Sequence, residues 1–151
     1  MLMLTRLTGF GAGGGGIDAT PDAIDFADIS DSGFTASAFT NVVTLSGIDT
    51  TITLRLTLSV GMSAERTVVA YRNGAFVIAG SSGTTLDVAL TNGQTLQYAF
   101  TNAQNLSTWF STATLSNLCD GGQVLDTFTY TLTDSGSEPV GVGGPVGGPI
   151  P

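Results

Sequence analysis

Apolar and polar residues alternate along much of the middle of the chain, most regularly in residues 51–60, TITLRLTLSV. One face of this segment carries threonines, a serine and an arginine, and the other carries Ile52, Leu54, Leu56, Leu58 and Val60. A two-residue period is typical of a β-strand with one buried face, and burial of each large aliphatic side chain stabilises a fold by roughly 1.5–3 kcal/mol. The pattern therefore predicts a strand over 51–60.

The Asn-Gly dipeptide at 73 and 74 predicts a tight β-hairpin. These two residue types tolerate the positive φ angles of a two-residue type I′ turn. Such a turn pairs Tyr71 with Phe76 and Val69 with Ile78, so that all four side chains share one apolar face, as cross-strand packing requires.

A second Asn-Gly dipeptide, at 92 and 93, predicts a different connection. A two-residue loop there would place the apolar residues of the two flanking strands on opposite faces. The conflict disappears if the chain crosses at 91–94 to a second sheet that is packed over the first. The residues expected to meet across this shared core are Leu86, Val88, Leu90, Leu96, Tyr98 and Phe100.

Further strands are predicted at 41–47, 107–117 and 123–133, which brings the total to about seven or eight. Short alternating strands separated by turn residues are typical of a β-sandwich. The one helical candidate is 20–29, TPDAIDFADI, with Thr20 as cap and Pro21 in the first turn. We therefore expect an N-terminal attachment arm (1–20), a sandwich domain (21–133) and a Gly/Pro-rich C-terminal extension (134–151) that cannot form a helix or a central strand.

Charge and cysteine content narrow the classes of partner. Charged residues make up 11% of the chain, the four basic residues are all arginines, and the net charge is −8. Binding to nucleic acid or to an anionic membrane depends on clustered cationic side chains, so neither partner is expected. Cys119 is alone, which excludes an internal disulfide, and we expect a half-buried thiol. The first ten residues fit neither a secretory signal nor a membrane span, which predicts a chain made and kept in the cytoplasm unless a larger assembly carries it out.

The common catalytic and cofactor sites find little support in the sequence. Without histidine there is no Ser-His-Asp triad and no imidazole metal ligand. Residues 7–16, LTGFGAGGGG, match G-x-G-x-x-G, but no adequate helix follows and the chain has no lysine. We interpret these glycines as a flexible arm and expect no catalytic residue, no cofactor and no metal.

Two features leave alternatives open. Asp22, Asp25, Asp28 and Asp31 recur every third residue, which favours a solvated acidic loop over a calcium site because the spacing does not match a D-x-D-x-D-G loop. Among the aromatic residues, Trp109 and its neighbour at 110 cannot both be buried in a regular strand. Burial of an aromatic side chain is commoner than exposure for ligand stacking, and the alternative is a carbohydrate-stacking surface formed by Trp109 and Phe110.

Three segments, TNGQTLQYAFTNA, STATLSN and DTFTYTLT, carry a resemblance that covers roughly residues 50–133. An Asn/Asp-Gly-x-Thr turn that opens a strand, followed by Thr-rich strands, resembles the closing half of the Ig-like or fibronectin-like β-sandwich module. Such modules occur in virion structural proteins of tailed bacteriophages and in bacterial surface proteins. The resemblance implies an all-β, Ig-like β-sandwich that has a binding or structural role and no catalytic site.

Two classes of function follow as expectations, with an enzyme third. The first is a virion structural protein, such as a capsid decoration protein, that is held to capsid or tail subunits by its termini and forms a homo-oligomer. The composition, in which Thr, Ser, Asn and Gly supply most of the polar surface, is typical of β-rich surface proteins. A virion protein leaves the cell by lysis, which reconciles that composition with the expected absence of a signal peptide. The expected assembly contacts are Leu2, Leu4, Leu7, Phe10, Val140, Val142, Val146 and Ile150. The second class is a tail-fibre or adhesin-type module that binds a host-surface glycan.

Overall fold

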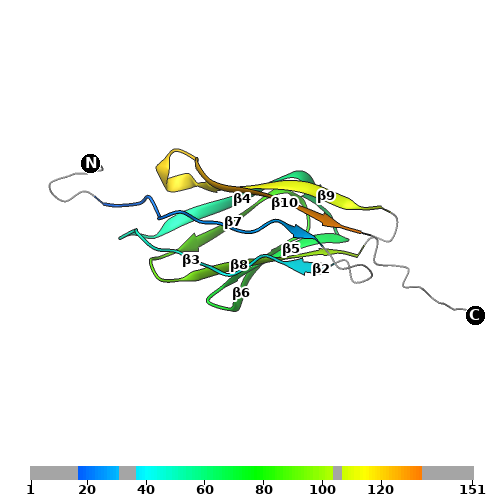
Figure 1. Ribbon diagram of the computed structural model, residues 1–151, viewed down its shortest axis with the longest axis horizontal. Helices are drawn as coiled ribbons and strands as arrows, with labels where there is room; N and C mark the ends of the chain where they lie inside the picture. Colours follow the sequence, from blue (N-terminus) through cyan, green and yellow to red (C-terminus); the bar gives the residue numbers. More distant parts are fainter. Residues whose placement is uncertain (1–16, 31–36, 104–106, 134–151) are drawn as a thin grey trace, which may run out of the picture.

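The computed structural model describes residues 17–30, 37–103 and 107–133, and these residues form two stacked layers of β-strands (Figure 1). The strands of this part of the chain are β1 (Ile29–Ser30), β2 (Ser37–Phe39), β3 (Val43–Thr44), β4 (Ile52–Met62), β5 (Arg66–Arg72), β6 (Ala75–Gly80), β7 (Gly83–Leu90), β8 (Thr95–Asn102), β9 (Trp109–Asn117) and β10 (Gln123–Leu132). The expected all-β sandwich is confirmed. The three shortest strands, β1 to β3, precede the seven longer ones.

One layer has the strand order β1-β10-β9-β4-β7, and the other has the order β2-β8-β5-β6, with β3 also paired to β8. The pairing is antiparallel throughout, except that β1 runs parallel to β10. We call the first layer the threonine sheet and the second the apolar sheet, after the residues on their outer faces.

The crossing between layers at the second Asn-Gly is confirmed, because β7 belongs to the threonine sheet and β8 to the apolar sheet. The six residues expected to meet across the core are all buried. Aromatic rings fill the centre, where the ring of Phe100 lies 4.2 Å from that of Tyr130 and 6.3 Å from that of Phe128, measured between centroids. Such contacts add roughly 0.5–1.5 kcal/mol per pair to the burial of apolar area.

The strand predicted over 51–60 is present as β4, with one correction at its end. Leu58 and Met62 are buried, but Val60 is 39% exposed and does not join the core face. The main chain of Val60 leaves the ladder: its amide donates to Ser111 Oγ (3.0 Å) and its carbonyl accepts from Trp109 Nε1 (3.0 Å). These side-chain bonds replace strand pairing and let the Val60 side chain turn to solvent.

The first Asn-Gly forms the predicted turn, with φ of 55° at Asn73 and 78° at Gly74. Tyr71 pairs with Phe76 as expected. The expected pairing of Val69 with Ile78 is wrong, because a register shift between positions 70 and 71 pairs Val69 with Ala79 instead.

The helix predicted over 20–29 is wrong: the described chain is extended from Ile17 to β1. Ile24 and Phe26, two residues apart, are both buried, which is the period of an extended chain and not of a helix. The Thr20 hydroxyl does not cap a helix but donates to Asp120 Oδ2 (2.9 Å).

The helical structure in the described residues is a short 3₁₀ turn, η1 (Leu118–Asp120). The described part of the chain has no helix that is long and apolar enough to cross a membrane. Cys119 lies in η1 and is exposed, so the expected half-burial is wrong; a turn outside the strands gives its side chain no layer to pack beneath.

Candidate attachment segment and exposed surfaces

Residues 18–30 form an extended segment, here called the clamp, that runs along one open side of the sandwich between the two layers (Figure 1, blue). The first residues of the clamp, 18–20, belong to the segment 1–20 that was expected to be an attachment arm. Its apolar side chains enter the core: Phe26 is 1% exposed, and its ring lies 5.5 Å from the rings of both Tyr98 and Phe128. Because Tyr98 belongs to one layer and Phe128 to the other, Phe26 joins the two.

The clamp is hydrogen-bonded to the threonine sheet at several points. The Phe26 amide donates to Asp126 Oδ2 (2.6 Å), and the Thr129 amide donates to Asp28 Oδ1 (3.3 Å). Asn117 Nδ2, which is fully buried, donates to the carbonyl of Ala19 (2.7 Å). At its far end, the clamp becomes β1 and pairs with β10.

A second group of hydrogen bonds ties the clamp to residues 41–49, the segment that contains β3 of the apolar sheet. Asn41 accepts from the Ala27 amide (2.9 Å) and donates to the carbonyl of Asp25 (3.0 Å). The Asp22 amide donates to the carbonyl of Ser46 (2.8 Å), and the Ser46 hydroxyl donates to Asp22 Oδ2 (2.9 Å).

A reciprocal pair holds the start of the clamp to the same segment. The Asp18 amide donates to Asp49 Oδ1 (2.7 Å), and the Asp49 amide donates to the carbonyl of Asp18 (2.9 Å). The clamp is therefore bonded to both layers along its length. Residues 18–20, which were expected to belong to the arm, are therefore bonded to the sandwich.

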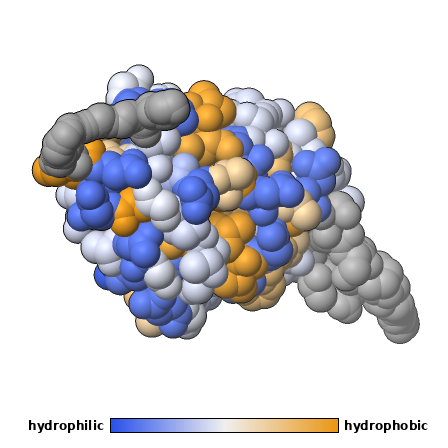
Figure 2. Space-filling view, turned by 60° about the vertical axis from the view of Figure 1, so that its left-hand side comes forward, coloured by the Kyte–Doolittle hydropathy of each residue, from blue (hydrophilic) through white to orange (hydrophobic). Residues whose placement is uncertain are grey.

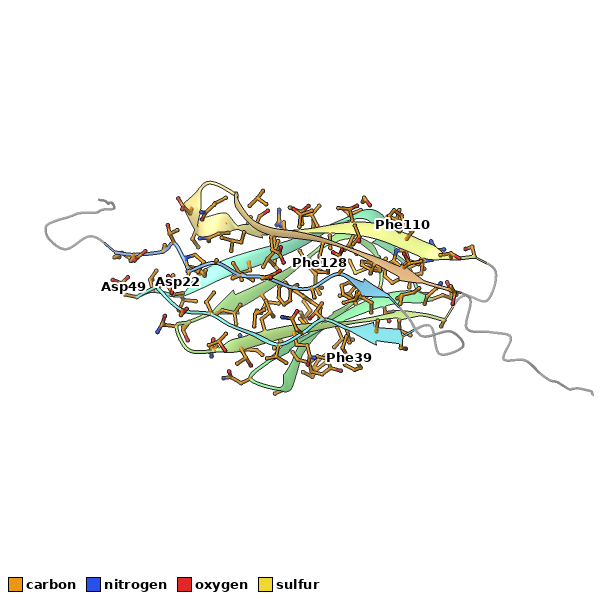
Figure 3. The ribbon with its side chains drawn as sticks, viewed as in Figure 1. Asp22, Phe39, Asp49, Phe110 and Phe128 are labelled. Carbon is orange, nitrogen blue, oxygen red and sulfur yellow. The ribbon has the colours of Figure 1, made fainter. Side chains whose placement is uncertain are left out.

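The aspartates singled out at 22, 25 and 28 do not converge. The Asp22 and Asp28 side chains bond Ser46 and the Thr129 amide, on different layers, and Asp25 bonds Asn41 through its main chain. In Figure 3 the labelled Asp22 and Asp49 both lie at the end of the molecule where the described chain begins. Within the described ranges, no group of three or more His, Cys, Asp or Glu side chains is placed to hold a metal ion. Asp31 lies outside those ranges.

Trp109 is buried, so the alternative of a carbohydrate-stacking surface at this residue is wrong. Its side chain is 0% exposed, its ring packs against Tyr130 with centroids 5.0 Å apart, and the Arg66 guanidinium lies 6.0 Å from its centroid. The neighbouring Phe110 is the outward residue and is 55% exposed. Figure 3 shows Phe110 and Phe39 on opposite outer faces of the sandwich, with Phe128 between the layers.

The eight expected assembly contacts, and the glycine run at 9–16, lie outside the described residues. Sequence reasoning also missed the residues that hold the clamp, chiefly Asp126, Asn117 and Asn41. Each of them bonds a main-chain group at least 14 positions away. Their polar side chains were the available signal, and a polar residue type does not identify its partner.

Hydrogen bonding and burial shift the pKa of Asp87 and of two core tyrosines. Hydrogen bonding from Arg55 lowers the pKa of Asp87, in an ion pair with 2.8 Å between Arg55 Nε and Asp87 Oδ1 on the outer face of the threonine sheet. Burial raises the pKa of Tyr98 and of Tyr130 well above the ordinary tyrosine value. Both tyrosines lie in the closed core, and these shifts follow from packing.

Comparison with known proteins does not identify a family for this chain. No family model matches the chain, and the comparison with curated proteins found no match. Among solved structures, the chain is similar to the N-terminal domain of PorA, with 12% identity and a TM-score of 0.39 over 76% of this chain and 88% of that one. A likeness at that level carries no argument about function.

Proposed function

We propose that this chain is a non-enzymatic structural protein of a bacteriophage particle, such as a capsid decoration protein, held to its neighbours by its termini. The observation that carries the proposal is the clamp. Residues 1–16 lead directly into a segment bonded to both layers and anchored in the core by Phe26. A pull on the N-terminal sequence is therefore shared by the whole sandwich and does not peel off one strand.

The chemistry of the clamp supports a structural role. Its carboxylates, and those that face it, accept hydrogen bonds from main-chain amides and hydroxyls, which is what a rigid scaffold needs. Charge-assisted bonds of this kind are worth roughly 1.5–3 kcal/mol each. The virion assignment itself is supported by the sequence resemblance over residues 50–133.

Attachment by short terminal segments is weak for one copy and strong for many. On a particle, each further contact forms at a high effective concentration, so overall binding can exceed that of one contact by roughly 10²–10⁴-fold. The arm carries apolar side chains that can pack into a groove or against a sheet edge of a neighbouring subunit, namely Leu2, Leu4, Leu7 and Phe10.

The test is particle association with matched truncations. The full chain, a variant lacking 1–16 and a variant lacking 134–151 are each supplied to particles that lack the protein, and the particles are purified on a density gradient. We expect the full chain to sediment with the particles, and the variant lacking 1–16 to keep its circular dichroism spectrum and melting temperature while losing sedimentation. Retention of that variant, or failure of the full chain to sediment with the particles, contradicts the proposal.

A second candidate function is glycan binding, favoured by Phe110. Its exposed ring lies on a hydroxyl-rich face, where it pairs with Thr131 beside Thr112. An aromatic ring among hydroxyls is a surface that can stack on sugar. Binding of the full chain to a glycan array, lost in Phe110→Ala and kept without residues 1–16, would establish this function in place of attachment.

A further inference from the structure

The two outer faces of the sandwich differ in chemistry. On the threonine sheet, one row crosses four strands and pairs Thr127 with Thr114, Thr114 with Thr57 and Thr57 with Thr85. A hydrated outer face of this kind is usual for an antiparallel sheet. The apolar sheet departs from that rule, and exposed apolar area that is gathered in one place usually marks an interaction site.

Two neighbouring rows make up the centre of the apolar outer face. Val68 and Ala70 are fully buried, so the alternate residues Val69 and Tyr71 of β5 face outward. The first row, in order across the strands, is Phe39, Ala99, Val69 and Ala79. The second row is Gln97, Tyr71 and Phe76.

The aromatic rings at the two sides of this face are solvent-exposed. Phe39 in β2 is 59% exposed, and Phe76 in β6 is 63% exposed. Small side chains lie between and beside the large ones, so the face has raised and recessed positions. Figure 2 shows that apolar surface on the molecule gathers in distinct patches between hydrophilic regions.

The charge distribution indicates which partner fits. The chain carries a net charge of −8, yet β2, β3, β5, β6 and β8 contain no Asp or Glu and two arginines, Arg66 and Arg72. The described carboxylates lie in the clamp, in loops, in η1 and on the threonine sheet, and they are Asp18, Asp22, Asp25, Asp28, Asp49, Glu65, Asp87, Asp120 and Asp126. Two such acidic molecules repel each other over most of their surfaces, and least when their apolar sheets face each other.

We propose that the outer face of the apolar sheet is the surface through which two copies of this chain associate as a twofold dimer. A twofold contact brings the same patch of both copies together, so the patch must complement itself. The first row is self-complementary. If the twofold axis runs parallel to the strands and passes through the middle of this row, Phe39 of each copy contacts the small Ala79 of the other. Large side chains then meet small ones, as close packing of two sheets requires.

The size of the face predicts a weak dimer. The strands of the face lie about 4.8 Å apart and contain three residues in β2, eight in β8, seven in β5 and six in β6, at about 3.4 Å each, so that together they cover roughly 400 Å². That is about half of the roughly 800 Å² per partner that a specific interface typically buries, and interfaces below that range are weak or transient. The dimer is therefore expected to be reversible.

Sedimentation equilibrium of the full chain over a range of concentrations tests this, with three substituted proteins beside it. Phe39→Lys and Phe76→Lys place a cation on the face and are expected to weaken association about 30-fold or more each, the effect of losing a hot-spot residue. Phe110→Lys is the matched control, since Phe110 is 55% exposed on the other sheet, and it should leave association unchanged.

Any of the following results would overturn the proposal. A full chain that stays monomeric up to millimolar concentration has no such interface. A dimer unaffected by Phe39→Lys and Phe76→Lys, or one lost in Phe110→Lys, uses another surface. If the chain dimerises only after residues 134–151 are removed, then that segment and not a second copy covers the face. These measurements use purified protein, so their result is independent of whether the chain associates with a virion.

Discussion

Asp126 accepts a 2.6 Å hydrogen bond from the backbone amide of Phe26, a residue 100 positions earlier whose ring is 1% exposed. This hydrogen bond thus gives the main-chain amide of Phe26 a partner at the point where the clamp inserts its largest side chain into the core. Removal of the acceptor leaves a partly buried amide without its partner, which costs more than the net value of the bond.

We expect Asp126→Ala to lower the free energy of unfolding by about 1.5–3 kcal/mol. Asp126→Asn keeps an acceptor and should cost less. Urea denaturation measures both, with Asp25→Ala as the control, because Asp25 is exposed and bonds Asn41 through its carbonyl. Equal stability of Asp126→Ala and the unsubstituted protein would show that the clamp does not depend on this bond.

Phe26→Ala should destabilise the fold by about 3–5 kcal/mol, because it removes a buried ring that contacts both layers and leaves a cavity. Phe110→Ala is the matched control, since that ring is 55% exposed and lies on the other sheet, and its cost should stay within about 0.5 kcal/mol. Thermal and urea unfolding of the two variants give the comparison. A small cost for Phe26→Ala would mean that the clamp only rests on the surface.

Tyr98→Phe should be neutral or stabilising by up to about 1 kcal/mol. The Tyr98 side chain is buried, and its hydroxyl has no hydrogen-bond partner in the described chain, so the substitution removes an unsatisfied polar atom.

The same substitution should change the response to alkali. Burial raises the pKa of Tyr98. The part of the folding stability that depends on a protonated Tyr98 is therefore fully present below the pKa of an unfolded tyrosine, about 10, and is lost as the pH rises above it. Tyr98→Phe should therefore lose less stability than the unsubstituted protein between about pH 9 and pH 12. Urea unfolding at a series of pH values tests this, and identical alkaline profiles would count against burial as the cause.

The ion pair on the threonine sheet predicts a response to acid. The hydrogen bond from Arg55 lowers the pKa of Asp87, so its stabilisation is present above the pKa of an unfolded aspartate and is lost as the pH falls through the lowered value. Asp87→Asn should lower stability near pH 6, and the difference from the unsubstituted protein should shrink as the pH falls below the ordinary aspartate pKa of about 3.9. The effect at pH 6 should be small, because both side chains are 40% exposed. A difference that does not shrink as the pH falls would indicate a role other than charge.

Much of the sandwich could be predicted from local pattern. The alternation through Ile52 and Leu54 gave β4, and the clash of apolar faces at 92–93 gave the crossing between sheets. Val60 departed from the pattern because Trp109 and Ser111 bond its main chain, a contact across about 50 positions that periodicity does not contain.

The clamp could not be predicted, because its local signals favour another structure. Thr20 and Pro21 resemble a helix start, yet the extended form is held by bonds to distant residues such as Asn117 and Asp126. Likewise, the sequence predicted that at least one of the adjacent aromatic residues Trp109 and Phe110 is exposed, but it did not indicate which one. The burial of Trp109 and the exposure of Phe110 follow from the phase of β9 relative to β10, which is set by pairing.

Hydrogen exchange at the Phe26 amide tests most directly whether the clamp belongs to the body of the sandwich. If the clamp joins both layers, this amide should exchange as slowly as the hydrogen-bonded amides between β9 and β10, and through the same cooperative opening. Asp126→Ala should speed exchange at Phe26 far more than at the strands of the apolar sheet. Fast exchange at Phe26 in the unsubstituted protein, at the rate of an exposed loop, would contradict the account.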